Sequence, residues 1–249
     1  MKKAGNYRQY YFKFSEFITY MTEGALISAF IVWIFYKSPA ALILSIPGAA
    51  VFLFNRRKKL AEKRRRRFNI QFKDAITAMS AALIAGYSLE NSITESNREM
   101  RLLYGEESDI CRELNHMTAK LKLNIPIENL FMDLAERSDL EDIKIFAQII
   151  NIAKRTGGNM VAIIKNTAET ITQKVETKQE IEVLISAKKM EQRIMNIVPI
   201  FMIAYISITS PGFFDVMYET IIGRIIMTTC LALYFVSYYL SERIANIEI

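Results

Sequence analysis

Apolar residues gather into four long runs along the chain, two near its start and two near its end. The runs cover residues 17–36, 39–54, 194–210 and 221–240. A helix that crosses a membrane needs about 20 mostly apolar residues, with roughly 17 as a lower limit. The pattern therefore predicts about four transmembrane helices, of which the second is the shortest.

Between the two pairs of runs, apolar positions follow the spacing of amphipathic helices, and no stretch shows strand-like alternation. Six apolar faces follow one another between Phe68 and Met190. The sequence therefore predicts an all-α membrane protein with a six-helix antiparallel bundle between its membrane segments. The six faces are Phe68, Phe72, Ala75, Ile76, Met79 and Leu83; Leu89, Ile93, Met100 and Leu103; Ile110, Leu114, Met117 and Leu121; Ile127, Leu130, Phe131 and Leu134; Leu140, Ile143, Phe146, Ala147, Ile150 and Ala153; and Met160, Ile163, Ile164, Thr167, Ile171 and Val175.

Three of the predicted turns share one pattern, because residues 86–93, 124–131 and, more loosely, 157–164 can be aligned. Each begins with Gly or Asn, which tolerate the left-handed conformation that ends a helix. A residue that favours a helix start follows two positions later, as an N-cap or as a first-turn proline. We expect three tight antiparallel helical hairpins, with the structural turn residues Gly86, Ser88, Asn124, Pro126, Gly157, Gly158 and Asn159. A separate capping box over residues 138–141 is predicted to open the fifth helix.

Nine basic residues directly follow the second apolar run. They are Arg56, Arg57, Lys58, Lys59, Lys63, Arg64, Arg65, Arg66 and Arg67. A basic cluster beside a membrane span marks the cytoplasmic side, where anionic headgroups attract it by roughly 1 kcal/mol per basic residue. We therefore expect these side chains to contact membrane lipids, although similar blocks also occur on nucleic-acid-binding arms.

The basic block sets the expected topology in the cytoplasmic (inner) membrane. With four spans, both termini and the central domain lie in the cytoplasm. The chain then divides into an interfacial segment with a transmembrane hairpin (1–54), a polybasic segment (55–67), a cytoplasmic helical domain (68–193) and a second transmembrane pair (194–249). A cleaved signal peptide is the alternative for the N-terminus, but its apolar region begins late and another follows at once.

Composition narrows the possible chemistry. The chain carries a net charge of +6, but residues 68–193 hold 16 basic and 19 acidic side chains, which argues against a nucleic-acid surface. Cys111 and Cys230 fall in different environments, His116 is the single histidine, and no Gly-rich loop ends in Gly-Lys-Ser/Thr. The sequence predicts no catalytic, cofactor-binding or metal site.

Three features leave alternatives open. Glu23 and Arg224 fall within spans, where they either reach the headgroups or line an ion or proton pathway. The turn over residues 156–159 is either a helix-to-helix turn or an anion-binding nest. The third feature is a group of acids that either complements a helix dipole or holds a divalent ion, namely Glu106, Glu107, Asp109 and Glu113.

From Met160 to about Arg193 the helical pattern meets no strong breaker, and the third span begins at Ile194. One continuous helix would couple the central domain mechanically to the membrane. Pro199 lies inside that span, where it is expected to kink the helix.

Several motifs, taken in their order, resemble the type II secretion system F family, in particular the TadB-like platform proteins of Flp and type IVb pilus machines. They are residues 72–76 (FKDAI), 85–89 (AGYSL), 134–138 (LAERS) and 156–159 (TGGN), followed by Gln192, Arg193 and Pro199. The resemblance covers about residues 68–210. Asn124 departs from the family, which often has Gly there, but Asn can take the same conformation.

The resemblance implies a non-enzymatic platform of a pilus assembly machine. Such a platform engages a cytoplasmic secretion ATPase and passes its motion to pilin subunits that leave the membrane. This chain holds one helical domain where other members hold two, which implies a TadC-like sister protein in a homo- or hetero-oligomer. A small membrane transporter and a membrane-tethered signalling adaptor are the alternatives.

Overall fold

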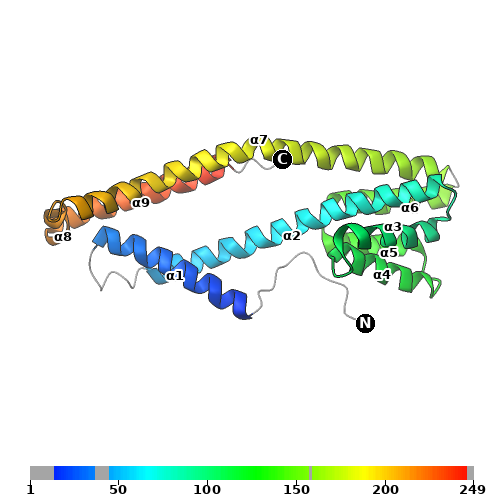
Figure 1. The fold of residues 1–249 in the computed structure, drawn as a ribbon, viewed down its shortest axis with the longest axis horizontal. Coiled ribbons are helices and arrows are strands. Elements are labelled where there is room, and N and C mark those ends of the chain that lie inside the picture. The colour runs from blue at the N-terminus through cyan, green and yellow to red at the C-terminus, as the bar shows by residue number, and fades with distance from the viewer. Residues whose placement is uncertain (1–13, 37–44, 157–158, 246–249) are drawn as a thin grey trace. The chain divides into compact units, whose positions relative to one another are not determined.

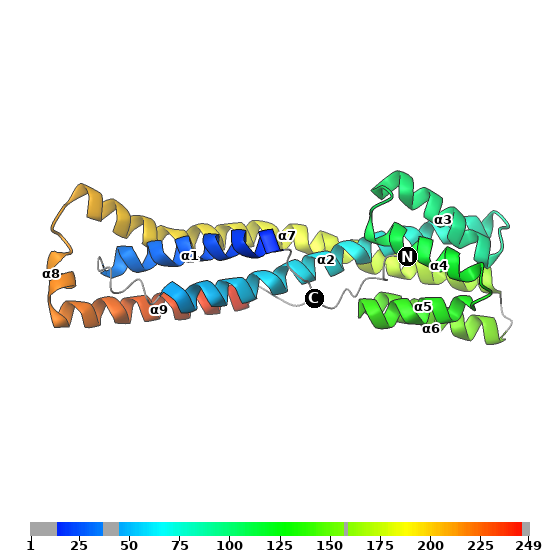
Figure 2. The ribbon, with the colours of Figure 1, turned by 90° about the horizontal axis from the view of Figure 1, so that it is seen from below.

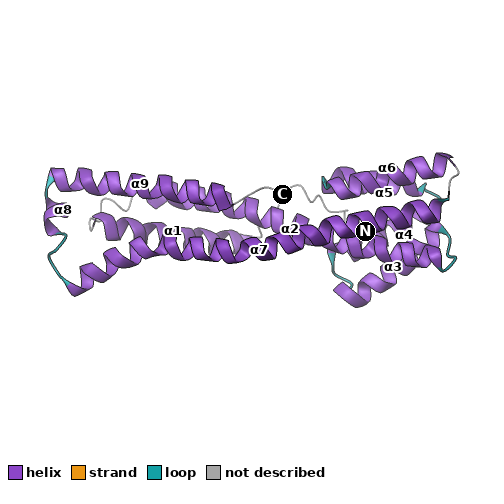
Figure 3. Ribbon diagram, turned by 90° about the horizontal axis from the view of Figure 1, so that it is seen from above, coloured by secondary structure: helices purple, strands orange, loops and turns teal. Residues whose placement is uncertain are grey.

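The computed structural model describes residues 14–36, 45–156 and 159–245. The described part of the chain is α-helical, with no strand (Figures 1 and 3). The helices are α1 (Phe14–Tyr36), α2 (Ser45–Ile84), α3 (Leu89–Tyr104), α4 (Asp109–Leu121), α5 (Ile127–Ser138), α6 (Glu141–Thr156), α7 (Met160–Thr209), α8 (Asp215–Glu219) and α9 (Ile221–Ala245).

The contacts divide these helices into two compact units. Unit 1 contains residues 58–178, that is, the end of α2, helices α3 to α6 and the start of α7. Unit 2 contains α1, the start of α2, the end of α7, α8 and α9. Helices α2 and α7 therefore contribute residues to both units.

The core of unit 1 forms from the six predicted apolar faces. Fully buried Phe72 of α2 packs edge-to-face against Phe146 of α6, with ring centroids 5.6 Å apart, and Phe131 of α5 packs on the same ring at 5.1 Å. The prediction that Leu103 belongs to the buried face of α3 is wrong, because its side chain is 60% exposed. Met100 is buried, and Tyr104, one turn further, packs against the core in its place.

Two buried polar residues also hold unit 1 together. The carboxylate of Asp142, which is 5% exposed, accepts hydrogen bonds from Asn69 of α2 at 2.8 Å and from Lys174 of α7 at 2.7 Å. These contacts raise the pKa of Lys174, with the hydrogen bond to Asp142 as the largest cause. The hydroxyl of buried Ser96 donates to the carbonyl oxygen of Ala75 at 2.7 Å, which joins α3 to α2.

The closest backbone packing in unit 1 is between helices that the repeated turns do not join. The repeated turns join α2 to α3, α4 to α5 and α6 to α7, whereas the closest pairs within unit 1 are α3 with α4 and α5 with α6 (Figure 2), which other turns connect. Helix–helix separation depends on the side chains at the contact. In α2, the large side chains of Phe68 and Phe72 are fully buried in the core.

The turn between α5 and α6 also differs from the expected capping box. Ser138 is the last residue of α5, and its hydroxyl donates to the carbonyl oxygen of Ala135. Asp139 follows with φ +56°, a left-handed conformation that Asp tolerates better than most residues. Ser138 therefore ends one helix and does not cap the next.

In unit 2, helices α1, α7 and α9 pack through a small apolar cluster centred on Ile34, Met227 and Leu231. The hydroxyl of Tyr218 donates to the carbonyl oxygen of Ile34, and that of Tyr234 to the carbonyl oxygen of Asn196, both at 2.8 Å. A membrane interior offers no water to such hydroxyls, so hydrogen bonds between helices satisfy them.

Three described helices are long and apolar enough to cross a membrane: α1 over Phe17–Ile34, α7, and α9 over Ile221–Ile244. The apolar window of α7 has no buried residue, as expected for a surface that meets lipid or other helices. The predicted fold class, an all-α membrane protein, is confirmed. Part of the second predicted span, residues 39–44, lies outside the described residues, and residues 45–54 form the start of α2.

Candidate functional site

The nine residues of the basic block all lie on α2, and their surroundings differ along the helix. Arg56 to Lys59 are exposed, and the guanidinium of Arg56 lies 5.2 Å from the ring centroid of Tyr20 in α1, a cation–π distance. Lys63, Arg66 and Arg67 are also exposed. These side chains are accessible to an anionic surface.

Two residues of the block instead bind acids of unit 1. Arg64 donates two hydrogen bonds to the carboxylate of Asp109, at 2.9 and 3.1 Å. Arg65 donates to the carbonyl oxygen of Asp139 and lies 3.6 Å from its carboxylate. These partners lie 45 and 74 residues away in the sequence, and nothing in a charge run indicates which of its members a fold will use.

The residues of the repeated turns occupy the ends of the helices. Gly86 has φ +93° and Asn124 φ +56°, so both are left-handed. The Ser88 hydroxyl accepts from the backbone N–H of Asn91 at 3.3 Å, and the Asn159 side chain from that of Ala162 at 3.2 Å. Pro126 precedes the first residue of α5, one position earlier than expected. Gly157 and Gly158 lie outside the described residues.

Helices α2, α4 and α6 end at the same end of unit 1 (Figure 1), so the described residues of the repeated turns lie there. An ion pair of 2.8 Å between Lys154, near the end of α6, and Glu128, at the start of α5, connects two of them. The hydrogen bond from Lys154 is the largest cause that lowers the pKa of Glu128. This end of unit 1 therefore carries two turns that are described throughout, beside the end of α6.

A buried ion pair joins α4 to α5. Glu113 is 2% exposed, and Arg137 donates to both its carboxylate oxygens, at 2.7 and 2.9 Å. Asp133, 3.2 Å from Arg137 and 3.5 Å from Lys120, extends the network. Burial alone would raise the pKa of Asp133, but the hydrogen bond and charge of Arg137 outweigh it and lower that pKa. Burial alone would lower the pKa of Arg137, but its hydrogen bonds to the carboxylates and their charges raise that pKa, with Glu113 as the main cause.

The two leading motifs of the resemblance therefore have structural roles. Arg137, in residues 134–138, anchors the Glu113 carboxylate. Asp74, in residues 72–76, accepts a hydrogen bond from the Tyr104 hydroxyl and pairs with Lys73 at 3.1 Å. Burial and this contact raise the pKa of Tyr104 to about 12. Both motifs therefore connect helices of unit 1.

Each carboxylate of the acidic group has an arginine partner. Asp109 binds Arg64, Glu113 binds Arg137, Glu107 binds Arg112, and Glu106 lies 3.7 Å from Arg101. No group of three or more potential metal ligands gathers in the described part of the chain. The four carboxylates contact four different arginines, whereas the ligands of a divalent ion would converge on one point.

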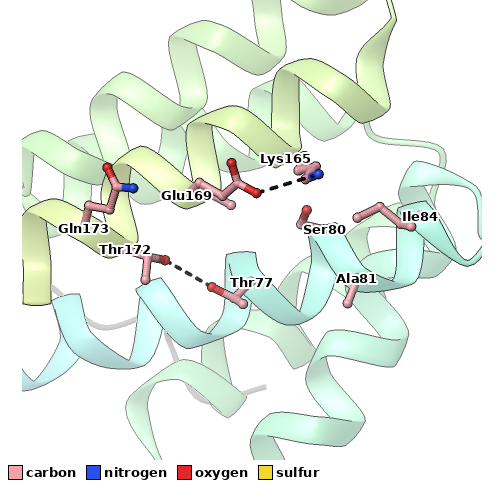
Figure 4. A pocket seen from close by; sticks show the side chains of 9 residues that line it. Thr77, Ser80, Ala81, Ile84, Lys165, Glu169, Thr172 and Gln173 are labelled. Carbon is pink, nitrogen blue, oxygen red and sulfur yellow. Dashed lines mark hydrogen bonds and ion pairs between the residues drawn. The ribbon is translucent and has the colours of Figure 1, made fainter.

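A pocket between α2 and α7 of unit 1, of about 350 Å³, is lined mostly by small and polar side chains (Figure 4). Thr77 and Thr172 face each other with their hydroxyls 3.3 Å apart, and Lys165 lies 3.8 Å from Glu169. These groups form no arrangement of nucleophile, base and orienting group. The lone cysteine of unit 1, Cys111, is fully buried.

Of the two charged residues in the predicted spans, Arg224 uses its guanidinium within unit 2. Its Nε donates to the carbonyl oxygen of Tyr218 at 2.8 Å, at the junction of α8 and α9. Glu23 is exposed on α1. Arg224 therefore stabilises a helix junction, as a residue near a membrane boundary can.

Helical unit 1 and the apolar helices of unit 2 together define a helical membrane protein without a catalytic constellation among the described residues. The model of the type II secretion system protein F family matches residues 75–208, more than half of the chain. The chain belongs to this family, whose members are membrane platform proteins of secretion and pilus machinery. Neither the comparison with curated proteins nor that with solved structures gave a match.

Proposed function

We propose that this chain is a non-enzymatic, TadB-like platform protein of a Flp or type IVb pilus assembly machine in the cytoplasmic membrane. In this proposal, residues 68–193 lie in the cytoplasm, dock a secretion ATPase and act with a TadC-like sister protein. The platform passes the motion of the ATPase to pilin subunits that leave the membrane. Family membership supports this role, and the motifs quoted above favour the TadB-like branch.

The observation that carries the mechanism is the continuity of α7. This single helix runs from Met160 to Thr209. Its first part buries Ile164, Ile171 and Val175 in the core of unit 1, and its last part carries exposed apolar residues such as Phe201. A helix transmits displacement and rotation along its axis, whereas a flexible linker transmits little of either. The proposal therefore assigns force transmission to α7.

The test is a flexible Gly-Ser insertion after Lys189, which interrupts α7 outside the core of unit 1. ATPase retention in a pull-down should persist, because unit 1 still folds, while pilus output should stop. The matched control places the same insertion between exposed Glu106 and Glu107, in the turn before α4, and should leave output near normal. Normal piliation with the insertion after Lys189 would contradict coupling through α7.

A further inference from the structure

A groove on unit 1 between α3 and α4, of about 740 Å³, has basic walls. Its lining includes Arg98 and Arg101 on α3, Asn115 and Lys120 on α4, and Lys122 and Leu123 in the turn that follows. We call it the α3–α4 groove. No carboxylate is among the described residues that line it, although α3 and α4 carry several acids on their other faces.

The cations of the groove are only loosely held by neighbouring acids. Glu95 lies 3.7 Å from Arg98. Asp133 lies 3.5 Å from Lys120 but closer, at 3.2 Å, to Arg137, which is outside the groove. Lys122 is exposed, and no ion pair is recorded for it in the described part of the structure. Exposed pairs at such distances are weak, so carboxylates of a partner can replace them.

The floor of the groove fixes one cation in place. The side-chain oxygen of Asn115 accepts a hydrogen bond from Arg101 at 2.6 Å and another from Asn97, which is 5% exposed, at 2.8 Å. Asn115 thereby orients Arg101. The carboxylate of exposed Glu106 lies 3.7 Å from this guanidinium, a weak pair, so a carboxylate of a partner can still meet its fork geometry. A guanidinium held in advance loses little freedom on binding.

An apolar residue marks the end of the groove. Leu123 is 72% exposed, next to Asn124, whose left-handed backbone belongs to the second repeated turn. Backbone hydrogen bonds from Leu123 to Lys120 and from Asn124 to Leu121 hold this turn. A large apolar side chain on a fixed turn, beside a basic groove, suits a partner with both acidic and apolar residues.

We propose that the α3–α4 groove docks an acidic segment of a partner protein, with carboxylates on its cations and an apolar side chain on Leu123. Its volume far exceeds that of a phosphate ion, and Leu123 would add nothing to phosphate binding. Nucleic acid fits less well, because residues 68–178 hold 13 basic and 16 acidic side chains outside the basic block. The inference goes beyond the proposed function and needs only that the partner is a protein.

The test uses the full chain in uncharged detergent micelles and a fluorescent 12-residue peptide with the repeat Glu-Glu-Leu-Glu. The double variant Arg98→Glu/Lys122→Glu spares the contacts of Arg101 and Lys120. The matched control Lys144→Glu/Lys178→Glu makes the same charge change at exposed positions of unit 1 outside the groove. Binding is measured by fluorescence anisotropy at physiological salt, and the basic block is identical in all three chains.

We expect the groove variant to weaken peptide binding by about tenfold, since like charges facing each other across an interface are strongly unfavourable. The control should change it by less than about twofold, and Leu123→Asn should weaken it by several-fold without any change of charge.

Equal losses in both double variants would show unspecific attraction and overturn the proposal. A 12-nucleotide single-stranded DNA that binds through the same groove residues as tightly as the peptide would also overturn it. Neither result involves pilus output, so failure here and failure of the proposed function are distinguishable.

Discussion

At the scale of single residues, the buried ion pair between Glu113 and Arg137 is the contact whose loss should destabilise unit 1 most. Glu113 is 2% exposed, and Arg137 supplies both hydrogen bonds to its carboxylate that join α4 to α5. Removing one partner of a buried pair leaves an uncompensated charge, which costs about 3 kcal/mol or more. A pair on the surface costs far less, because water replaces the lost partner.

Arg137→Met should therefore lower the free energy of opening of unit 1 by about 3 kcal/mol. Cys111 is fully buried in this unit, so the rate of its labelling by a thiol reagent reports that opening in a Cys230→Ser background. The rate should rise about a hundredfold. Lys165→Met, which removes an exposed pair with Glu169, is the control and should change the rate by less than about fivefold. Similar rates for the two variants would contradict a structural role for the buried pair.

The same network makes the parental chain sensitive to acid. Because Arg137 lowers the pKa of Asp133, this carboxylate contributes stability above its unfolded pKa of about 4, and the contribution is lost as pH falls through the lower folded value. Labelling of Cys111 should accelerate over that range. With Arg137→Met the Asp133 part of this acceleration should be smaller, because only Lys120 then still lowers the pKa of this carboxylate. An unchanged pH profile would contradict the role of Arg137 in the acid sensitivity.

At the scale of elements, the turns show what a sequence can indicate. Gly86 and Asn124 correctly indicate helix ends in the left-handed conformation, because few other residues tolerate that conformation. Asp139 also adopts the left-handed conformation. The pattern at residues 138–141 resembles a capping box, however, and therefore predicted a helix start where a helix ends. Short-range signals fail where one segment suits two local structures, here a helix end at Ser138 and a helix start three residues later.

Gly86 allows a test of the repeated turn at a described position, in place of Gly157. Its φ is +93°, and an added Cβ would meet no atom within 4 Å, so the cost of a substitution comes from the backbone alone. Gly86→Val should cost about 1–2 kcal/mol and raise the labelling rate of Cys111 by about tenfold. Gly86→Asn should cost much less, because Asn tolerates positive φ. Equal effects of Val and Asn would refute the conformational explanation.

At the scale of the whole molecule, the sequence predicted the helical class and the six core faces, because the spacing of apolar residues determines both. It could not predict the pairing of Arg64 with Asp109, the orientation of Arg101 by Asn115, or the basic groove itself. Those features join residues of different helices, whose neighbours depend on packing. Periodicity identifies which face of a helix is buried and leaves the partner of each side chain open.

The membrane topology is the last prediction. If the basic block faces the cytoplasm and α7 crosses the membrane, a cysteine at exposed Ser210, after the apolar part of α7, lies outside. Cys111 is too buried to act as the inner reporter, so exposed Lys144 on α6 replaces it. In a Cys230→Ser background, Ser210→Cys should react with an impermeant maleimide in intact cells, and Lys144→Cys only after permeabilisation of the membrane. The reverse pattern would place unit 1 outside, where no cytoplasmic ATPase could reach it, and would overturn both the orientation and the proposed coupling.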